Sequence, residues 1–365
     1  MSKRLKLLVD AHVFDSEFQG SRTFIEELYK SALELYSDKI DFHFAAHSDF
    51  ELKKSFGSDF NFVPLNSKNK FMRLGLEFPK IIKDKGFDWA HFQYIAPPIR
   101  KCRYLVTCHD ILFESFPEFF PVGYRLTKHL MFKYSAKKAD ILSTVSEYSR
   151  KDISTIYNIP EKDIILTKNA VRKIEKNTIS LSDKGKNILY LSRIEPRKNH
   201  HLLLEVFLES GLMEKGYKLI MVGKESIKNH KLDKLLIGLK SDQKKSIQFI
   251  PSVREEEKWD LIDRSCLFVY PSLAEGFGIP PLEAGLRKTS VICSNLTAMK
   301  EFNFFKPFHI DSSEKEILAK SLENALADTN QLRLDKISNQ ISSEYSWNKS
   351  AEALCEAIIN KSKGG

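Results

Sequence analysis

The sequence predicts an α/β protein built from two Rossmann-like, doubly wound domains, each a parallel sheet covered by helices on both faces. Short apolar runs recur along the chain, and amphipathic helical segments separate them. This pattern restarts near residue 187, after a polar, charge-rich segment without apolar periodicity. With 365 residues, 42% of them hydrophobic, the chain is long enough for two domains with cores of their own.

Each expected element follows from a local pattern of apolar residues. In the first half, we expect strands near 5–11, 40–46, 60–64, 88–93, 103–108 and 140–145, and helices near 22–36, 72–84, 123–138 and 146–157. In the second half, we expect strands near 187–191, 218–222, 247–250, 266–270 and 289–293, with helices between the later strands. A helix over 198–210 follows the first of these strands, and helical structure is expected from 313 onward. The predicted division is an N-terminal domain over 1–172, a linker over 173–185 and a C-terminal domain over 186–345. The carboxyl ends of both sheets would then line a cleft between the domains.

Composition and charge argue against several classes of protein. No run of 18 apolar residues occurs, so no membrane-spanning helix is expected. The apolar part of the N-terminus ends at Asp10 and is too short for a signal peptide, which predicts a cytoplasmic protein. Five cysteines, an odd number with no Cys-x-x-Cys pair, argue against a disulfide framework or a zinc site.

The segment over 271–283 carries the most chemical information. It follows the apolar run 266–270 and reads as strand, glycine turn and proline-started helix, which places a helix N-terminus at the carboxyl edge of the sheet. Glu275 and Glu283 stand in it with seven residues between them. Carboxylates bind hydroxyls and the turn amides bind phosphates, so the segment suits a sugar nucleotide. The amides expected to face the ligand are those of Gly276, Phe277 and Gly278.

Two cations are placed to hold a diphosphate. Arg193 ends the strand over 187–191, and Lys198 stands at the start of the next helix. If the diphosphate is a leaving group, these charges also stabilise it as it departs. Because the sequence contains no Asp-x-Asp and no Walker motif, we expect these cations and helix N-termini, rather than a metal ion or cofactor, to neutralise the diphosphate.

The first half contributes two further candidates. His109 ends the strand over 103–108 and is followed by Asp110, so it could form a hydrogen bond with a substrate hydroxyl. Gly20 opens the first helix and would permit close approach of a phosphate. Ser146 follows another strand and is best explained as a helix N-cap.

Together these segments resemble the retaining, family-4 (group 1) nucleotide-sugar glycosyltransferases of the GT-B fold. The resemblance spans the chain and is strongest at Ser192–Asn199 and Glu275–Glu283. Residues 345–351 resemble the family's closing helix, which implies that residues 346–365 return to the first domain. The resemblance also implies that the domain over 1–172 binds the acceptor and that the domain over 186–345 binds the nucleotide-sugar donor. The chain departs from the family pattern at Ser192, at Lys288 and Ser290, and in having one glycine at Gly20.

The resemblance implies a role for each candidate. Arg193 and Lys198 would neutralise the donor diphosphate, and the loop at Gly20 would approach it from the other domain. Sugar hydroxyls would bind Glu275 and the amides of Phe277 and Gly278, whereas Glu283 would bind the ribose. His109 would lie near the reacting carbon. Transfer would retain the anomeric configuration by front-face attack, with the leaving phosphate taking the acceptor's proton.

The stretch over 118–138 has two interpretations. It mixes aromatic residues with five cations, and it lies within residues 100–138, where eight Lys and Arg face three acids. A basic amphipathic helix beside aromatic residues can lie on an anionic membrane surface, here the inner face of the cell membrane. The resemblance supports this interpretation, because many members of the family use this region to bind lipid-linked acceptors. Alternatively, it is a packed helix with a solvated basic face. The cations are Arg125, Lys128, Lys133, Lys137 and Lys138.

The expected substrates follow from the resemblance alone. The donor would be a GDP- or UDP-hexose, with mannose favoured, and the acceptor a glycan or lipid-linked glycan in surface polysaccharide or lipopolysaccharide synthesis. A GT-B-fold sugar-nucleotide epimerase is an alternative. A non-enzymatic basic binding protein is another, although a net charge of +9 is mild and no nucleic-acid motif occurs.

Overall fold

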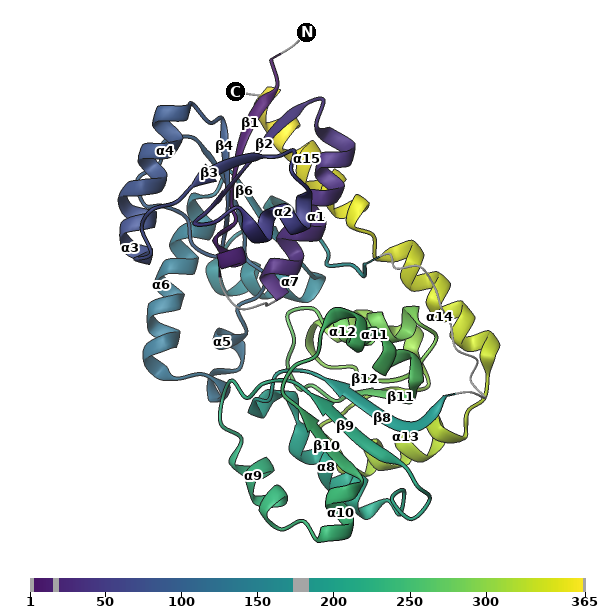
Figure 1. The fold of residues 1–365 in the computed structure, drawn as a ribbon. Coiled ribbons are helices and arrows are strands. Elements are labelled where there is room, and N and C mark those ends of the chain that lie inside the picture. Colours follow the sequence, from purple (N-terminus) through teal and green to yellow (C-terminus); the bar gives the residue numbers. More distant parts are fainter. Residues whose placement is uncertain (1–2, 16–19, 173–183, 364–365) are drawn as a thin grey trace. The chain divides into compact units, whose positions relative to one another are not determined.

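The computed structural model describes residues 3–15, 20–172 and 184–363 (Figure 1). The chain forms two compact units, one made of Met1–Asn169 with Ser346–Gly365 and the other of Ala170–Tyr345. Each unit has a wholly parallel sheet packed with helices, which confirms the predicted fold class. Residues 173–183 of the predicted linker lie outside the described part of the chain.

The first unit contains a seven-stranded sheet in the order β3-β2-β1-β4-β5-β6-β7. Successive strands step outward in one direction from β1 and in the other from β4, so the order reverses between these two neighbours. The strands are β1 (Leu5–Asp10), β2 (Ile40–Ala46), β3 (Asn61–Pro64), β4 (Trp89–Gln93), β5 (Arg103–Thr107), β6 (Ile141–Thr144) and β7 (Ile164–Leu166). The helices are η1 (His12–Asp15), α1 (Gly20–Tyr36), α2 (Phe50–Phe56), α3 (Lys70–Met72), η2 (Arg73–Glu77), α4 (Phe78–Lys85), α5 (Leu112–Ser115), η3 (Pro117–Phe119), α6 (Val122–Lys138), α7 (Glu147–Tyr157), η4 (Glu161–Asp163) and α15 (Trp347–Lys363).

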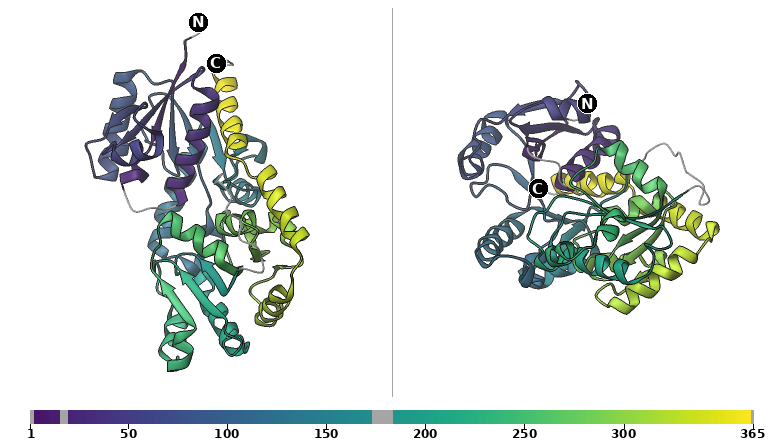
Figure 2. Two further views of the ribbon diagram at one scale, coloured as in Figure 1. Left: turned by 45° about the vertical axis from the view of Figure 1, so that its right-hand side comes forward. Right: turned by 60° about the horizontal axis from the view of Figure 1, so that its bottom comes forward.

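The C-terminal helix α15 packs beside α1, as the yellow and purple helices in Figures 1 and 2 show. The rings of Phe24 and Trp347 meet edge to face with centroids 6.0 Å apart. Ser350 Oγ donates a hydrogen bond to the Lys168 carbonyl at 2.6 Å. These contacts give the last helix a buried face against the first sheet's helices.

The second unit contains a six-stranded sheet in the order β10-β9-β8-β11-β12-β13. The order reverses between β8 and β11, as it does between β1 and β4 in the first unit. The strands are β8 (Gly185–Leu191), β9 (Lys218–Val222), β10 (Ile247–Ile250), β11 (Ser265–Tyr270), β12 (Ser290–Ser294) and β13 (His309–Ile310). The helices are η6 (Pro196–Lys198), α8 (His200–Glu209), α9 (His230–Ile237), α10 (Ser241–Lys245), α11 (Glu255–Arg264), α12 (Ile279–Leu286), η7 (Thr297–Glu301), η8 (Asn303–Phe305), α13 (Lys315–Ala327) and α14 (Gln331–Glu344).

Several elements differ from the sequence-based expectation. The short strands β7 and β13 and the helix α2 were missed, because so few residues show little periodicity. The predicted helix over 72–84 is three consecutive segments, α3, the π-helical η2, and α4. The helix expected to begin at Lys198 begins at His200. Among the described residues, no helix combines the length and the hydropathy needed to cross a bilayer.

A chain of hydrogen bonds runs through the core of the first unit. Tyr29 Oη lies 2.6 Å from His91 Nδ1, and His91 Nε2 lies 2.8 Å from Thr107 Oγ1. The Thr107 hydroxyl in turn lies 2.6 Å from the Ser143 hydroxyl. All four side chains are buried, so each depends on the others to satisfy its polar atoms. Burial, with a smaller contribution from nearby His109, lowers the pKa of His91 to about 3.

This pKa predicts that the protein loses stability in mild acid. In the unfolded chain, His91 takes up a proton near its ordinary pKa of 6.5, whereas the folded state resists protonation down to about pH 3. The contribution of neutral His91 to the free energy of unfolding is therefore fully present above the pKa of the unfolded state. It is lost as the pH falls from there toward the pKa of the folded state. Between about pH 8 and about pH 5, His91 alone should remove about 2 kcal/mol from the free energy of unfolding, measured by urea denaturation.

The variant His91→Gln provides the comparison, because glutamine keeps hydrogen-bonding atoms but does not titrate. It should be less stable than the native protein at about pH 8 and should show a weaker loss of stability at about pH 5. His230→Gln, at an exposed position, is the matched control. An identical pH dependence in the native protein and His91→Gln would show that His91 contributes nothing to acid sensitivity.

Candidate active site

The candidate site of the second unit lies at the carboxyl edge of its sheet, where the strand order reverses. Strands β8 and β11 are parallel neighbours there. Arg193 comes two residues after β8, and Glu275 comes five residues after β11. In open parallel sheets, ligands bind outside the carboxyl ends of the strands at such a reversal.

The turn that carries Arg193 is fixed by the neighbouring strand. The Ser192 amide donates to the Val222 carbonyl at 2.9 Å. Gly223 has φ +152, and a Cβ at this position would lie 1.9 Å from the Ser192 carbonyl oxygen, so only glycine fits. Arg193 itself is exposed, and its guanidinium makes no ion pair or hydrogen bond with the residues that the structure describes. The sequence prediction did not identify Gly223.

Lys198 lies in a short 3₁₀ turn rather than in the helix that follows. Asn199 adopts a left-handed conformation with φ 59, which separates η6 from α8 and moves the start of the helix to His200. The Asn199 side chain donates to the Ser312 carbonyl at 2.9 Å. As a result, Lys198 points into the unit and is only 6% exposed.

Lys198 and Glu275 form a buried ion pair. Lys198 Nζ donates to Glu275 Oε1, and the Tyr270 hydroxyl donates to the same oxygen at 2.8 Å. Arg197 lies 3.3 Å from Glu275 Oε2 and donates to Glu195 Oε1 at 2.8 Å. The turns after β8 and β11 therefore share one cluster of opposite charges.

This cluster keeps Glu275 ionised. Burial opposes the charge, but Lys198 and Arg197 favour it, and the hydrogen bonds from Lys198 and Tyr270 add to their effect. The result is a pKa of about 2 for Glu275. A carboxylate so strongly stabilised as an anion is a poor general base and a weak nucleophile.

Arg197 is a site residue that sequence reasoning missed. Its guanidinium donates to the Ala274 carbonyl at 2.5 Å, and its own carbonyl accepts from the Leu273 amide at 2.8 Å. Arg197 thus joins the turn after β8 to the segment that leads to Glu275. Nothing in the sequence distinguished it from the many exposed cations, because its role depends on burial between Glu195 and Glu275.

The glycine turn leads into α12 as predicted, but the Phe277 side chain belongs to the core. Its ring packs against Phe302 and Tyr345 at centroid distances of 5.7 and 5.9 Å. Gly278 has φ +103, and a Cβ there would approach Met299 Cγ to 3.1 Å. The amides of Gly276, Phe277 and Gly278 thus precede the first turn of α12, where N–H groups and the helix dipole favour an anion.

Glu283 is held apart from Glu275 by its own partner. It is 8% exposed and accepts a hydrogen bond from Lys258 Nζ at 2.7 Å. The same ammonium lies 2.9 Å from Glu255. The two glutamates therefore belong to separate charge clusters, and their different roles toward a ligand stay a prediction.

The predicted residues of the first unit lie at the carboxyl edge of its sheet. His109 follows β5, is 8% exposed, and bonds through Nε2 to Gln93 Oε1 at 2.8 Å. Burial lowers the pKa of His109 to about 4, so the ring is neutral near pH 7. Gly20 is the first residue of α1, with open space where a Cβ would stand. Ser146 caps α7 by accepting from the Ser149 amide, which confirms its structural role.

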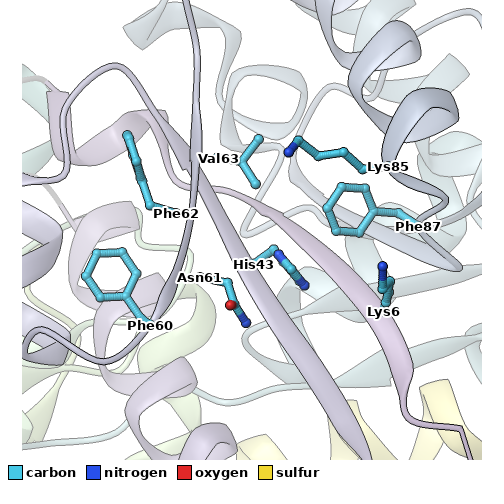
Figure 3. A pocket seen from close by; sticks show the side chains of 8 residues that line it. All are labelled: Lys6, His43, Phe60, Asn61, Phe62, Val63, Lys85 and Phe87. Carbon is cyan, nitrogen blue, oxygen red and sulfur yellow. The ribbon is translucent and has the colours of Figure 1, made fainter.

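A hollow of about 490 Å³ on the first unit lies away from the carboxyl edge of the sheet (Figure 3). It lies beside the amino-terminal halves of β1, β2 and β3, with Lys6 and Lys85 at its margin. Its central polar groups already have partners, because His43 Nε2 lies 2.9 Å from Asp41 and the Asn61 amide donates to Asp41 at 3.0 Å. This hollow therefore offers little to a ligand.

Two curated mannosyltransferases are similar to this chain. The chain is 29% identical over 232 residues to the O-antigen chain mannosyltransferase B of Escherichia coli, and 26% identical over 221 residues to the O-antigen chain mannosyltransferase RfbU of Salmonella typhimurium. The matched regions cover 59% and 60% of this chain and span about three fifths of each relative, 60% in both cases.

Solved structures share the fold of the whole chain. The Anabaena protein Alr3699/HepE, solved in complex with UDP and glucose, superposes with a TM-score of 0.73 at 16% identity over 98% of this chain and 100% of that one. A glycosyltransferase from Rickettsia africae superposes with a TM-score of 0.70 at 18% identity over 100% of both chains.

Two family models in succession cover residues 30–342 of the chain. The model described as Glycosyltransferase Family 4 matches residues 30–172, and the model described as Glycosyl transferases group 1 matches residues 171–342. The second match contains Arg193, Lys198, Glu275 and Glu283. The chain therefore belongs to the family-4, group 1 glycosyltransferases of the GT-B fold.

Proposed function

We propose that this glycosyltransferase moves mannose, with retention of configuration, from a GDP- or UDP-linked donor to a glycan or lipid-linked glycan acceptor in surface polysaccharide synthesis. The observation that carries the proposal is the charged cluster around Glu275 at the reversal point of the second sheet. The O-antigen mannosyltransferases that the chain resembles favour mannose. The UDP and glucose complex of Alr3699/HepE favours a nucleotide-sugar donor.

The donor's diphosphate would meet positive charge from several sources. Arg193 offers an exposed guanidinium, which can hold two phosphate oxygens at once. The amides before α12 add the positive end of a helix dipole. Lys198 adds an ammonium that shares its charge with Glu275. These groups would neutralise the leaving diphosphate without a metal ion or cofactor.

The state of Glu275 favours a mechanism in which the protein supplies no nucleophile. A glutamate with a pKa of about 2, held by Lys198 and Tyr270, would bind sugar hydroxyls as a fixed anion. Glu283 would hold the ribose in the same manner. His109 is neutral near pH 7 and would bind the donor sugar near the reacting carbon. The acceptor's proton would then pass to the leaving phosphate on the same face of the sugar.

Helix α6 would bring the enzyme to a membrane surface. Its exposed apolar side chains include Val122, Leu126 and Leu130, which are 64%, 66% and 70% exposed. Lys137 and Lys138 are exposed in its last turn. Apolar and basic side chains together allow a helix to lie in the headgroup region of an anionic membrane.

The function is tested by transfer from defined donors. With GDP-mannose and a synthetic lipid-diphosphate saccharide, we expect a product that α-mannosidase cleaves and whose anomeric coupling in NMR shows an α-linkage. EDTA should leave turnover unchanged. Without acceptor, the donor should undergo only slow hydrolysis. A β-linked product would contradict retention, and a new nucleotide sugar formed without acceptor would identify an epimerase instead.

Substitutions in the Glu275 cluster should affect both stability and activity. Glu275→Ala leaves Lys198 buried without its main counter-charge, so the free energy of unfolding should fall by about 3–5 kcal/mol. The double variant Lys198→Met with Glu275→Gln removes both charges and should recover most of that stability. It should still be inactive in the transfer assay. Recovery of activity together with stability would show that the pair serves only the fold.

A substitution of the exposed Arg193 should affect activity but not stability. Arg193→Gln should leave unfolding unchanged and lower turnover by about a hundredfold, because it removes charge from the departing diphosphate. Lys186→Gln removes an exposed cation from the opposite end of β8 and serves as the control. Equal turnover in both variants would make Arg193 an ordinary surface cation.

Membrane association is tested by flotation. The protein should float with liposomes that contain phosphatidylglycerol at low salt, and less with phosphatidylcholine alone or at high salt. Leu126→Asp, at an exposed position on α6, should reduce flotation without changing the melting temperature. Equal recovery with both kinds of liposome would rule out a role for anionic lipid.

A further inference from the structure

A second pocket lies at the point where the strand order of the first sheet reverses. It has a volume of about 180 Å³ and opens among the ends of β1 and β4, the segment α3–η2, and helix α6. Parallel sheets bind ligands at this position. The pocket borders two of the predicted donor contacts, because Ser21 in its lining follows Gly20 and Gln93 in its lining bonds to His109. Its cations, however, are not among the groups proposed to hold the donor.

The pocket gathers three cations from two segments. Arg73 lies in it at 6% exposure, and its Nε has no hydrogen-bond partner among the described residues. Lys70 comes from the preceding turn and Lys128 from α6. Partial desolvation, followed by the charges of Lys128 and Arg73, lowers the pKa of Lys70 to about 8. These cations therefore disfavour one another's charge.

One carboxylate lines the same pocket, and one of its two oxygens, Oδ1, is already engaged. Asp10 accepts a hydrogen bond from the His12 ring at 2.7 Å and from the His12 amide at 3.2 Å. Arg73 acts on Asp10 only through space, without a close ion pair. One carboxylate cannot balance three cations, so an anion that entered the pocket would relieve their mutual repulsion.

Gln93 adds an unused donor. Its Oε1 accepts from His109, while its Nε2 is buried without a hydrogen-bond partner among the described residues. Buried polar groups left in this way are uncommon and favour a missing acceptor. Through Gln93, the pocket also lies one hydrogen bond from His109, the residue proposed to contact the donor sugar.

An apolar groove of about 290 Å³ adjoins the pocket. The two share Leu74 and Ile95 in their linings. The groove runs between η2 and α6, and its walls include Phe71, Leu130 and Tyr134, which are 73%, 70% and 47% exposed. Large apolar side chains exposed together mark a binding surface more often than a free one.

The order of residues explains why the charges and the groove meet. Lys70 and Phe71 are neighbours in α3, and Arg73 and Leu74 begin the π-helical turn η2. Cationic and apolar side chains therefore lie close together in one short stretch, which lines both cavities together with α6. Single π-helical turns inside longer helices occur often at functional sites.

We propose that the pocket and the groove bind the acceptor as a lipid-linked diphosphate. The diphosphate would lie among Lys70, Arg73 and Lys128, and the first isoprenoid units would lie in the groove against Phe71 and Leu130. That the bound molecule is an acceptor rests on the proposed function. The binding itself is a separate property, which can be measured without any donor.

Farnesyl diphosphate is a suitable probe, because it carries both chemical parts. By isothermal titration calorimetry without nucleotide sugar, the full-length protein should bind it at least about tenfold more tightly than inorganic diphosphate. Arg73→Gln and Lys70→Gln should each weaken binding of both probes by about tenfold or more. Leu130→Gln should weaken only farnesyl diphosphate.

Two controls separate this site from others. Lys137→Gln removes one charge from α6 outside the pocket and should bind both probes as the native protein does. Arg193→Gln tests the donor site, where the proposed function places another diphosphate. The gain in affinity of farnesyl diphosphate over inorganic diphosphate should persist in this variant, because the groove lies in the first unit. Unfolding curves of each variant check that the fold is retained.

Three results would overturn the inference. If Arg73→Gln binds both probes with native affinity, the cations do not hold the diphosphate. If Leu130→Gln binds farnesyl diphosphate with native affinity, the groove does not hold the isoprenoid. Loss of farnesyl diphosphate binding in Arg193→Gln would place its diphosphate in the second unit. Probe binding in a protein that transfers no mannose would refute the proposed function and leave the inference intact, whereas mannose transfer without probe binding would do the reverse.

Discussion

The buried ion pair between Lys198 and Glu275 is the constraint on which the candidate site depends. Removing two charges from water costs several kcal/mol per ion, and only well-placed partners offset that cost. Here the partners come from different turns: Lys198 and Arg197 follow β8, whereas Tyr270 and Glu275 belong to β11 and the segment after it. The two turns cannot shift independently without breaking the cluster. The edge of the second sheet is therefore organised before any ligand arrives.

The sequence was enough to predict most of the fold and to place the candidate site residues at the edge of the sheet, but it did not identify the partners of those residues. Apolar runs locate strands of five or more residues, and residues just after such strands must lie at one edge of a parallel sheet, so Arg193 and Glu275 could be predicted. The choice of partner depends on the left-handed Asn199, which turns Lys198 inward. Arg197 was missed for the same reason, since its burial arises only in the folded chain.

The two units place charge at equivalent points of their sheets but compensate it to different degrees. In the second unit, Lys198 and Arg197 face Glu275 and Glu195 in a closed set of ion pairs. In the first unit, Arg73 and its neighbouring lysines face one carboxylate that already binds His12. A cluster whose charges are balanced holds a fixed shape. A cluster with excess positive charge is stabilised when an anion enters. The first arrangement suits orientation of a neutral sugar and the second suits capture of a charged group.

The compensation also restricts how a sugar could bind Glu275. A carboxylate has about four lone-pair positions. Oε1 already accepts from Lys198 and from Tyr270, and these two donors occupy its capacity. Among the described residues, Oε2 has only Arg197 as a partner, at the longer distance of 3.3 Å. A sugar hydroxyl that binds Glu275 would therefore donate to Oε2, and it would do so without displacing Lys198. On this basis the ion pair would persist in the donor complex proposed above, and Glu275 would hold the sugar without gaining a proton.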